Sequence, residues 1–222
     1  MKSNFKLIVF DCDGTLVDSL DGIVRSAQLA LAEMGHEQIL RPSDVAEVVG
    51  LSLVQAFEIL LPGATSRENT EAVALYRKHY KHLADAGQLS TPLYPGVRET
   101  LQRLQAAGLV MAVATGKSLK GLERNLQELD LGAYFSCLRT ADHAPSKPNP
   151  EMLFQVLAET GFTPQEALMV GDTEFDLNMG RGAGVKTCAV TFGCHSRQRL
   201  ALCQPDFWLD RMSDLPLQLG LK

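Results

Sequence analysis

Short runs of apolar residues recur along the chain, and most of them are bounded by Gly, Asp or Thr. They cover residues 6–10, 110–114, 168–170 and 187–190, with a less apolar candidate at 135–138. Runs of this length, rich in β-branched side chains, indicate buried strands. Stretches with helical spacing alternate with them, at 97–107, at about 151–160 and before Gly182 and Gly184. This alternation predicts an α/β core with a doubly wound, Rossmann-like parallel sheet.

Between residues 18 and 92 the strand pattern disappears and helical spacing replaces it. The pattern predicts helices at 23–34, 43–49 and 53–61, and Thr65 with Glu68 has the form of a capping box that opens a helix to about residue 86. Prolines at 92 and 95 mark the return to the core. We therefore predict a catalytic core of residues 1–17 and 93–222, with an inserted, all-helical cap domain at 18–92.

Composition excludes several classes of function. The chain has 222 residues, of which 45% are hydrophobic and 21% charged, as expected for a globular protein with a substantial core. A net charge of −5 argues against nucleic-acid binding, which needs clustered cations. The first apolar run ends at Asp11, which fits neither a targeting peptide nor a membrane span. We expect a cytoplasmic protein with no nucleic-acid or membrane partner, either a monomer or a homodimer.

The first strand is followed by a pair of acidic residues, Asp11 and Asp13. Side chains alternate along a strand, so these two should leave the same face while Cys12 points into packing. Carboxylates at the carboxyl end of a parallel strand lie where open α/β sheets bind ligands. Taken alone, the motif fits a turn equally well, because Asp and Gly are common turn residues.

Three further loops carry residues suited to a phosphate or a cation. Thr115 offers a hydroxyl donor, and Gly116 lets backbone N–H groups approach an anion at the start of a helix. Lys147 lies between two prolines, where a stiff backbone lowers the entropy cost of placing it on a phosphate. Asp172 and Asp176 are one helical turn apart if a helix begins near Asp172.

Electrostatics favours a metal at this collection of residues. Two carboxylates at ~4 Å repel by about 4 kcal/mol at an effective dielectric near 20, and a phosphate adds a charge of about −2. A divalent cation and a fixed lysine would offset this repulsion. Because the available ligands are oxygens, the expected cofactor is Mg²⁺.

The ordered motifs resemble those of the haloacid dehalogenase superfamily, specifically its phosphatases with a helical, C1-type cap inserted after the first strand. Residues 10–19, Phe-Asp-Cys-Asp-Gly-Thr-Leu-Val-Asp-Ser, are similar to the family's first motif. Thr115, Lys147 and Gly171-Asp172 with Asp176 match the other three in order. The resemblance covers nearly the whole chain and is nearest to the phosphoglycolate phosphatase-like group.

The resemblance implies roles for these residues. Asp11 would attack phosphorus and form an aspartyl-phosphate, while Asp13 would protonate the leaving oxygen and then activate water. Thr115 and Lys147 would hold the phosphoryl oxygens. The implied Mg²⁺ ligands are Asp11, the main-chain carbonyl of Asp13 and Asp172, with Asp176 in support directly or through water. The implied substrates are small phosphorylated metabolites, phosphoglycolate-like compounds or sugar phosphates.

Alternatives on related folds remain. β-Phosphoglucomutases share the overall plan but carry a histidine shortly after the first motif, and residues 20–25 contain none. Inorganic pyrophosphatase activity stays open. A receiver-like signalling domain also phosphorylates an Asp, but it lacks the helical insertion and the acids after the lysine.

The cap offers candidates for substrate choice. The family uses the region around Gly50, Leu51 and Ser52 for this purpose, although Ser52 equally fits a helix N-cap. Arg25 is a further candidate, for which a solvated helix face is the alternative.

Overall fold

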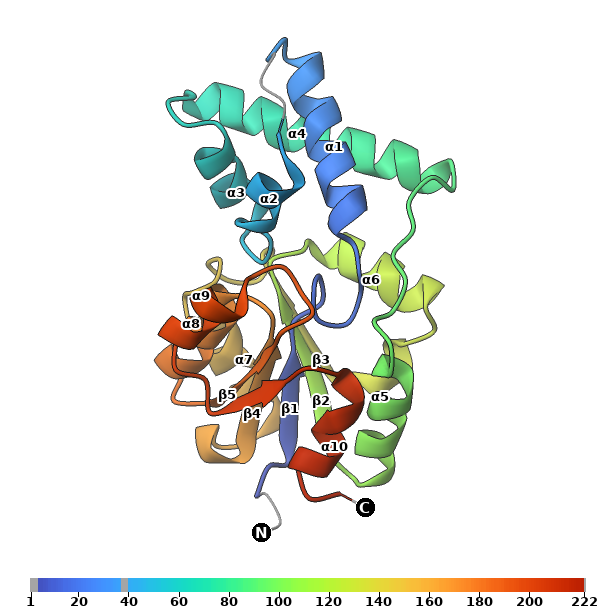
Figure 1. Ribbon diagram of the computed structural model, residues 1–222, viewed down its shortest axis with the longest axis vertical. Coiled ribbons are helices and arrows are strands. Elements are labelled where there is room, and N and C mark those ends of the chain that lie inside the picture. The colour runs from blue at the N-terminus through green and yellow to red at the C-terminus, as the bar shows by residue number, and fades with distance from the viewer. Residues whose placement is uncertain (1–3, 37–39, 222) are drawn as a thin grey trace.

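The computed structural model describes residues 4–36 and 40–221. Its core is one six-stranded, all-parallel sheet in the order β3-β2-β1-β4-β5-β6 (Figure 1). The strands are β1 (Leu7–Phe10), β2 (Val110–Thr115), β3 (Cys137–Thr140), β4 (Ala167–Gly171), β5 (Lys186–Val190) and β6 (Phe207–Leu209). The strand order reverses at β1, which places the topological switch point between β1 and β4.

Helices cover both faces of the sheet. One face packs against α5 (Val97–Ala106), α6 (Leu119–Glu128) and α10 (Leu215–Gln218) through a cluster that includes Ile8 and Phe10. The other packs against α7 (Glu151–Thr160) and α8 (Glu174–Gly182) through a cluster that includes Leu7 and Val9. Neighbouring residues of β1 thus enter opposite clusters, and all four are fully buried. The predicted doubly wound α/β core is confirmed.

Among the described residues, the first four of the five helices between β1 and β2 stand over the carboxyl ends of the strands (Figure 1). They are α1 (Leu20–Glu33), α2 (Pro42–Ala46), α3 (Leu53–Leu60) and α4 (Ser66–Asp85). They enclose a hydrophobic cluster of their own, centred on side chains such as Leu31, Phe57 and Tyr76. The predicted capping box opens α4, because the Thr65 N–H donates to the Glu68 carboxylate (2.7 Å) and the Glu68 N–H to the Thr65 hydroxyl (3.3 Å). No helix within the described ranges is long and apolar enough to cross a bilayer.

Two predicted elements are displaced. The strand expected at 135–138 lies at 137–140, because Phe135 instead packs edge-on against the Phe10 ring, with centroids 6.4 Å apart. The helix expected at 43–49 ends at Ala46, where the chain turns toward Gly50, whose φ of 97° is left-handed. The structure also adds β6 and α9 (Arg197–Leu202), which are too short for a periodic signal.

Candidate active site

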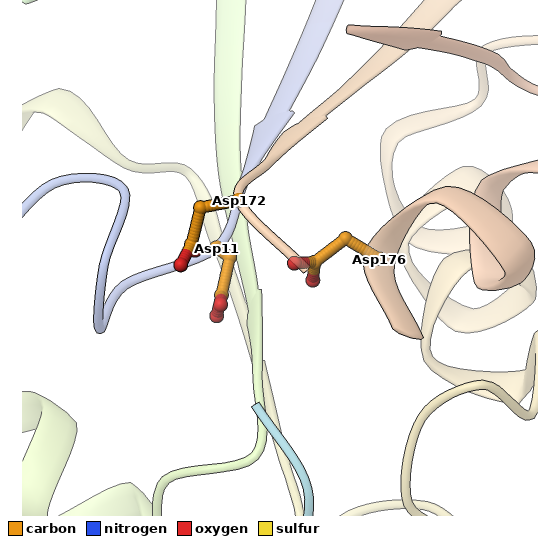
Figure 2. Close-up of side chains that lie close together, drawn as sticks. All are labelled: Asp11, Asp172 and Asp176. Atoms are coloured by element: carbon orange, nitrogen blue, oxygen red, sulfur yellow. The ribbon is translucent and has the colours of Figure 1, made fainter. Parts of the chain in front are cut away.

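Three buried carboxylates meet at the switch point of the sheet. Asp11 follows β1 and Asp172 follows β4, and the pairing of Phe10 with Val170 brings these strand ends together. Asp176 joins them from the first turn of α8. One carboxylate oxygen of each lies within 4.8 Å of those of the others, and all three residues have no exposed surface. Figure 2 shows the three carboxylates directed toward a common space.

Asp176 has its position because it closes the N-terminus of α8. Its Oδ2 accepts hydrogen bonds from the Thr173 N–H (3.0 Å) and the Thr173 hydroxyl (2.7 Å), which completes a capping box. Since α8 begins at Glu174, Asp172 precedes the helix. The condition for a shared helix face is therefore not met, and the end of β4 together with the first turn of α8 brings the two acids to one site.

Asp172 is held from two other loops. Its Oδ1 accepts from the Thr15 hydroxyl (2.8 Å) and its Oδ2 from the Cys194 N–H (2.7 Å). Two glycines make room for this carboxylate. A Cβ atom on Gly14 would lie 2.1 Å from Asp172 Oδ2, and one on Gly193 would lie 2.3 Å from Asp172 Cβ. The carboxylate is fixed by close packing as well as by hydrogen bonds.

Lys147 joins the acidic cluster as its cation. Its Nζ lies 2.8 Å from Asp11 Oδ1 and 2.6 Å from Asp176 Oδ1, and the side chain is fully buried. This burial rules out a solvated lysine. Apart from this ion pair with Lys147, neither Asp11 oxygen has a hydrogen-bond partner among the described residues. The cluster therefore holds three carboxylates and one ammonium group, which contacts Asp11 and Asp176.

Burial shifts the acid–base behaviour of this cluster. It raises the pKa of Asp11 well above its usual range, against the lowering effect of Lys147. Burial, followed by repulsion from Asp176, raises the pKa of Asp172 to about 7. For Lys147 burial lowers the pKa, but Asp11 and Asp176 outweigh it and the net pKa is raised. Without a further cation the site does not favour full ionisation of its acids.

Asp13 stands apart from the acidic cluster. Its Oδ1 accepts from the Ser19 hydroxyl (2.5 Å) and from Lys117 Nζ (2.9 Å), and Oδ2 accepts no hydrogen bond from the residues described. Asp13 is 8% exposed, whereas Asp11 is fully buried. The two acids of the first motif therefore occupy different environments, and Asp13 retains an oxygen for an outside partner.

The cap loop at residues 50–52 lies directly over Thr115 and Gly116, the candidates for phosphate binding. Thr115 is buried, and a Cβ atom on Gly116 would lie 2.4 Å from the carbonyl oxygens of Gly50 and Leu51. The Ser52 N–H donates to Ser146 Oγ (2.7 Å), beside Lys147. Gly50 and Leu51 thus approach the site through their main chain.

The side chains of the remaining cap candidates, Ser52 and Arg25, have other partners. Ser52 is the N-cap of α3, accepting weakly from the Gln55 N–H (3.4 Å), as the alternative interpretation predicted. Arg25 is exposed and donates to Gln88 (3.0 Å). The side chains of neither residue contact the acids described above.

Because Gly116 has no room for a side chain, we predict that Gly116→Ala lowers kcat/KM by about 100-fold, the cost of a misplacement near 1 Å. The added methyl group would hold the cap away from Thr115. Gly132→Ala is the matched control, since nothing lies within 4 Å of its Cβ position. Steady-state kinetics with a small aryl phosphate, alongside thermal melts, would test this, and equal rates for both variants would contradict it.

A match to a known family covers most of the chain. The model of the family described as haloacid dehalogenase-like hydrolase matches residues 8–190. The chain belongs to the haloacid dehalogenase-like hydrolase family. The match contains Asp11, Lys147, Asp172 and Asp176, which meet in space, and it also contains Thr115. The resemblance inferred from the motifs is confirmed.

Relatives of this haloacid dehalogenase-like chain extend over its full length. The pyrophosphatase PpaX of Bacillus velezensis is 34% identical over 97% of this chain and 96% of its own. A phosphoglycolate phosphatase of Salmonella paratyphi A is 30% identical over 98% of this chain and 94% of its own. A crystal structure titled as a predicted phosphoglycolate phosphatase, from Haemophilus somnus, is 27% identical with a TM-score of 0.84, covering 99% of this chain and all of that one. By family and relatives, the chain is a phosphatase of this family.

Sequence reasoning missed several side chains and one backbone group of the site. Thr15 and Ser19 lie inside the first motif, where their polar character and spacing were a usable signal. Lys117 follows Thr115 by two residues at a strand end and could have been found in the same way. The Cys194 N–H carries no sequence signal, although its place after β5 puts it at the same sheet edge.

Proposed function

We propose that this protein is a Mg²⁺-dependent phosphatase that hydrolyses small phosphorylated metabolites through an aspartyl-phosphate on Asp11. The observation that carries the proposal is the fully buried Asp11 carboxylate, whose oxygens have no polar partner among the described residues except Lys147. A buried carboxylate in this state is costly unless it serves a ligand or a reaction. Its neighbours, two acids and a lysine, suit a cation and a phosphoryl group.

The residues present fit a magnesium ion. Asp11, Asp172 and Asp176 offer only oxygen ligands, their oxygens lie within 4.8 Å of one another, and their charge exceeds that of Lys147. A bound Mg²⁺ would supply charge neutralisation for the phosphoryl oxygens. The main-chain carbonyl of Asp13 is proposed as a further ligand.

The proposed reaction uses two displacements at phosphorus. An oxygen of Asp11 forms a bond to phosphorus as the ester P–O bond breaks, and the leaving oxygen takes a proton from Asp13. A water molecule then gives its proton to Asp13 and attacks phosphorus, which breaks the Asp11–phosphate bond and releases phosphate. Thr115 and Lys147 hold the phosphoryl oxygens. The separate environments of Asp11 and Asp13 support this division of roles.

The proposed domain division assigns the cap, residues 18–92, to the exclusion of water and the choice of substrate. Two features support it. The helices α1–α4 enclose their own hydrophobic cluster, and the 50–51 loop lies on Gly116. Closing a site in this way removes water from the reacting groups. Substrate choice would then depend on the cap surface that faces Asp13.

Inorganic pyrophosphate is the second candidate substrate. The 34% identity to the pyrophosphatase PpaX favours it as strongly as the other relatives favour phosphoglycolate. The mutase alternative lacks comparable support, because residues 20–25 contain no histidine. The receiver alternative lacks it because this chain has a helical cap and carries Asp172 and Asp176 after Lys147.

We predict that hydrolysis of a generic aryl phosphate disappears in excess chelator and returns with Mg²⁺, because the acidic cluster would otherwise repel a phosphate dianion. Phosphate release in dialysed protein, with and without EDTA and added Mg²⁺, is the measurement. Thermal melts under the same conditions control for unfolding. Undiminished turnover in chelator would disprove the metal assignment.

A further inference from the structure

A cavity of about 360 Å³ opens on the Asp13 side of the site. Its wall includes Asp13, Thr115 and Lys117 but none of the three clustered acids and not Lys147. In the proposed reaction Asp13 is the group that meets the leaving oxygen. The cavity therefore begins where the leaving group of the substrate would lie, and its volume falls within the range of small-molecule sites.

From Asp13 the cavity runs between the helices of the cap. Every residue that α1, α2, α3 and the loop between α2 and α3 contribute to its wall is apolar. Examples are Ile23 and Ala27 of α1 and Phe57 and Leu60 of α3. This part of the wall gains little from a strongly hydrated ligand, because its side chains offer no partner for the ligand's polar atoms.

The charged residues of the wall are almost all basic. Asp13 is the single acid, and the cations are Arg77, Lys81, Lys117, Lys120 and Arg124. Arg77 and Lys120 are exposed and form no ion pair among the described residues. The chain carries a net charge of −5, so this cavity locally reverses the charge of the molecule. Such an entrance attracts anionic ligands.

We propose that the cavity receives the leaving group of the substrate and that this leaving group has an apolar body, an alkyl or aryl group, on its phosphate ester. The inference rests on the proposed function, because it takes Asp13 as the residue that meets the leaving oxygen. Phosphoglycolate and inorganic pyrophosphate have small, charged leaving groups that would leave the apolar wall unfilled. We therefore expect both to have a lower kcat/KM than a phosphate ester with an apolar body.

A series of n-alkyl monophosphates from methyl to octyl tests the inference. Beyond the first members their leaving groups have nearly the same intrinsic reactivity, so kcat/KM reports burial of the chain. We expect kcat/KM to rise by about fourfold per added methylene until the cavity is filled, and then to level off. The longest esters should exceed phosphoglycolate and pyrophosphate. Non-hydrolysable n-alkylphosphonates should bind with the same trend in calorimetry, with a negative heat-capacity change.

Two variants of α1 distinguish filling of this cavity from a general loss of activity. Ala27→Leu adds volume to the wall, so the ratio of octyl to methyl phosphate kcat/KM should fall at least tenfold and the levelling-off should move to shorter chains. Ala32→Leu is the matched control, because Ala32 lies on the same helix but is exposed, and its ratio should stay at the wild-type value. If Ala27→Leu melts at a much lower temperature, Ile23→Ala replaces it and should move the levelling-off to longer chains.

The outcomes distinguish this inference from the proposed function. If acetyl phosphate is hydrolysed but kcat/KM is flat or falls along the alkyl series, the inference is overturned and the phosphatase assignment stands. If no phosphate compound is hydrolysed with Mg²⁺, the proposed function fails. Phosphonate binding is then the only test of whether the cavity receives an apolar chain. Phosphonate affinity that does not increase with chain length, or that Ala27→Leu leaves unchanged, overturns the inference in either case.

Discussion

Replacing Asp11 with asparagine should lower kcat by about 10⁴-fold or more, because an amide is not a nucleophile at phosphorus. The fold should persist, since Asn has nearly the shape of Asp and removes one negative charge from a buried cluster of three carboxylates and one lysine. Phosphate release from a small aryl phosphate and thermal melts are the measurements. Retention of a tenth of the wild-type rate would place the nucleophile elsewhere.

Two further variants sharpen this test. Asp13→Asn keeps the nucleophile but removes the proton donor and base, so an ester with a good leaving group should leave some phosphate on Asp11, visible as added mass after quenching. Asp21→Asn changes an exposed acid of α1 and should leave kcat unaltered. A phosphorylated Asp11→Asn protein would contradict the assignment of Asp11.

Replacing Lys147 with methionine should lower the free energy of unfolding by about 3–5 kcal/mol in chelator, because it leaves Asp11 and Asp176 buried without their cation. The ammonium group lies 2.8 Å from Asp11 Oδ1 and 2.6 Å from Asp176 Oδ1, with no exposed surface. Methionine fills a similar volume, so the decrease in the free energy of unfolding would come from the missing charge more than from poorer packing. Urea unfolding at neutral pH measures it.

The double variant Lys147→Met with Asp11→Asn should recover part of this loss, since it removes a carboxylate along with the cation. Lys6→Met is the surface control. Lys6 pairs with Glu166 at 2.7 Å but its side chain is 62% exposed, so its loss should be about 1 kcal/mol or less. Equal losses for Lys147→Met and Lys6→Met would show that the buried ion pairs do not stabilise the fold.

Much of the fold follows from local patterns. β1, β2, β4 and β5 lie within a residue or two of their predicted positions, because each contains a short, mainly apolar run. The capping box at Thr65 is equally local. The pattern failed where tertiary packing used an apolar residue for another purpose, as at Phe135, which packs on Phe10 and leaves β3 to begin two residues later.

The sequence by itself determined that Asp11 and Asp172 lie at one edge of the sheet, because they directly follow parallel strands, whose carboxyl ends share that edge. Lys147 lies in the loop between β3 and α7, so only the tertiary structure decided that its ammonium group contacts Asp11. Only the tertiary structure decided that Asp13 pairs with Lys117, that the Cys194 N–H holds Asp172, and that an apolar cavity runs from Asp13 into the cap. The two contacts join core segments far apart in the chain, and the cavity depends on how the cap packs against the core, so no local pattern exists for any of them.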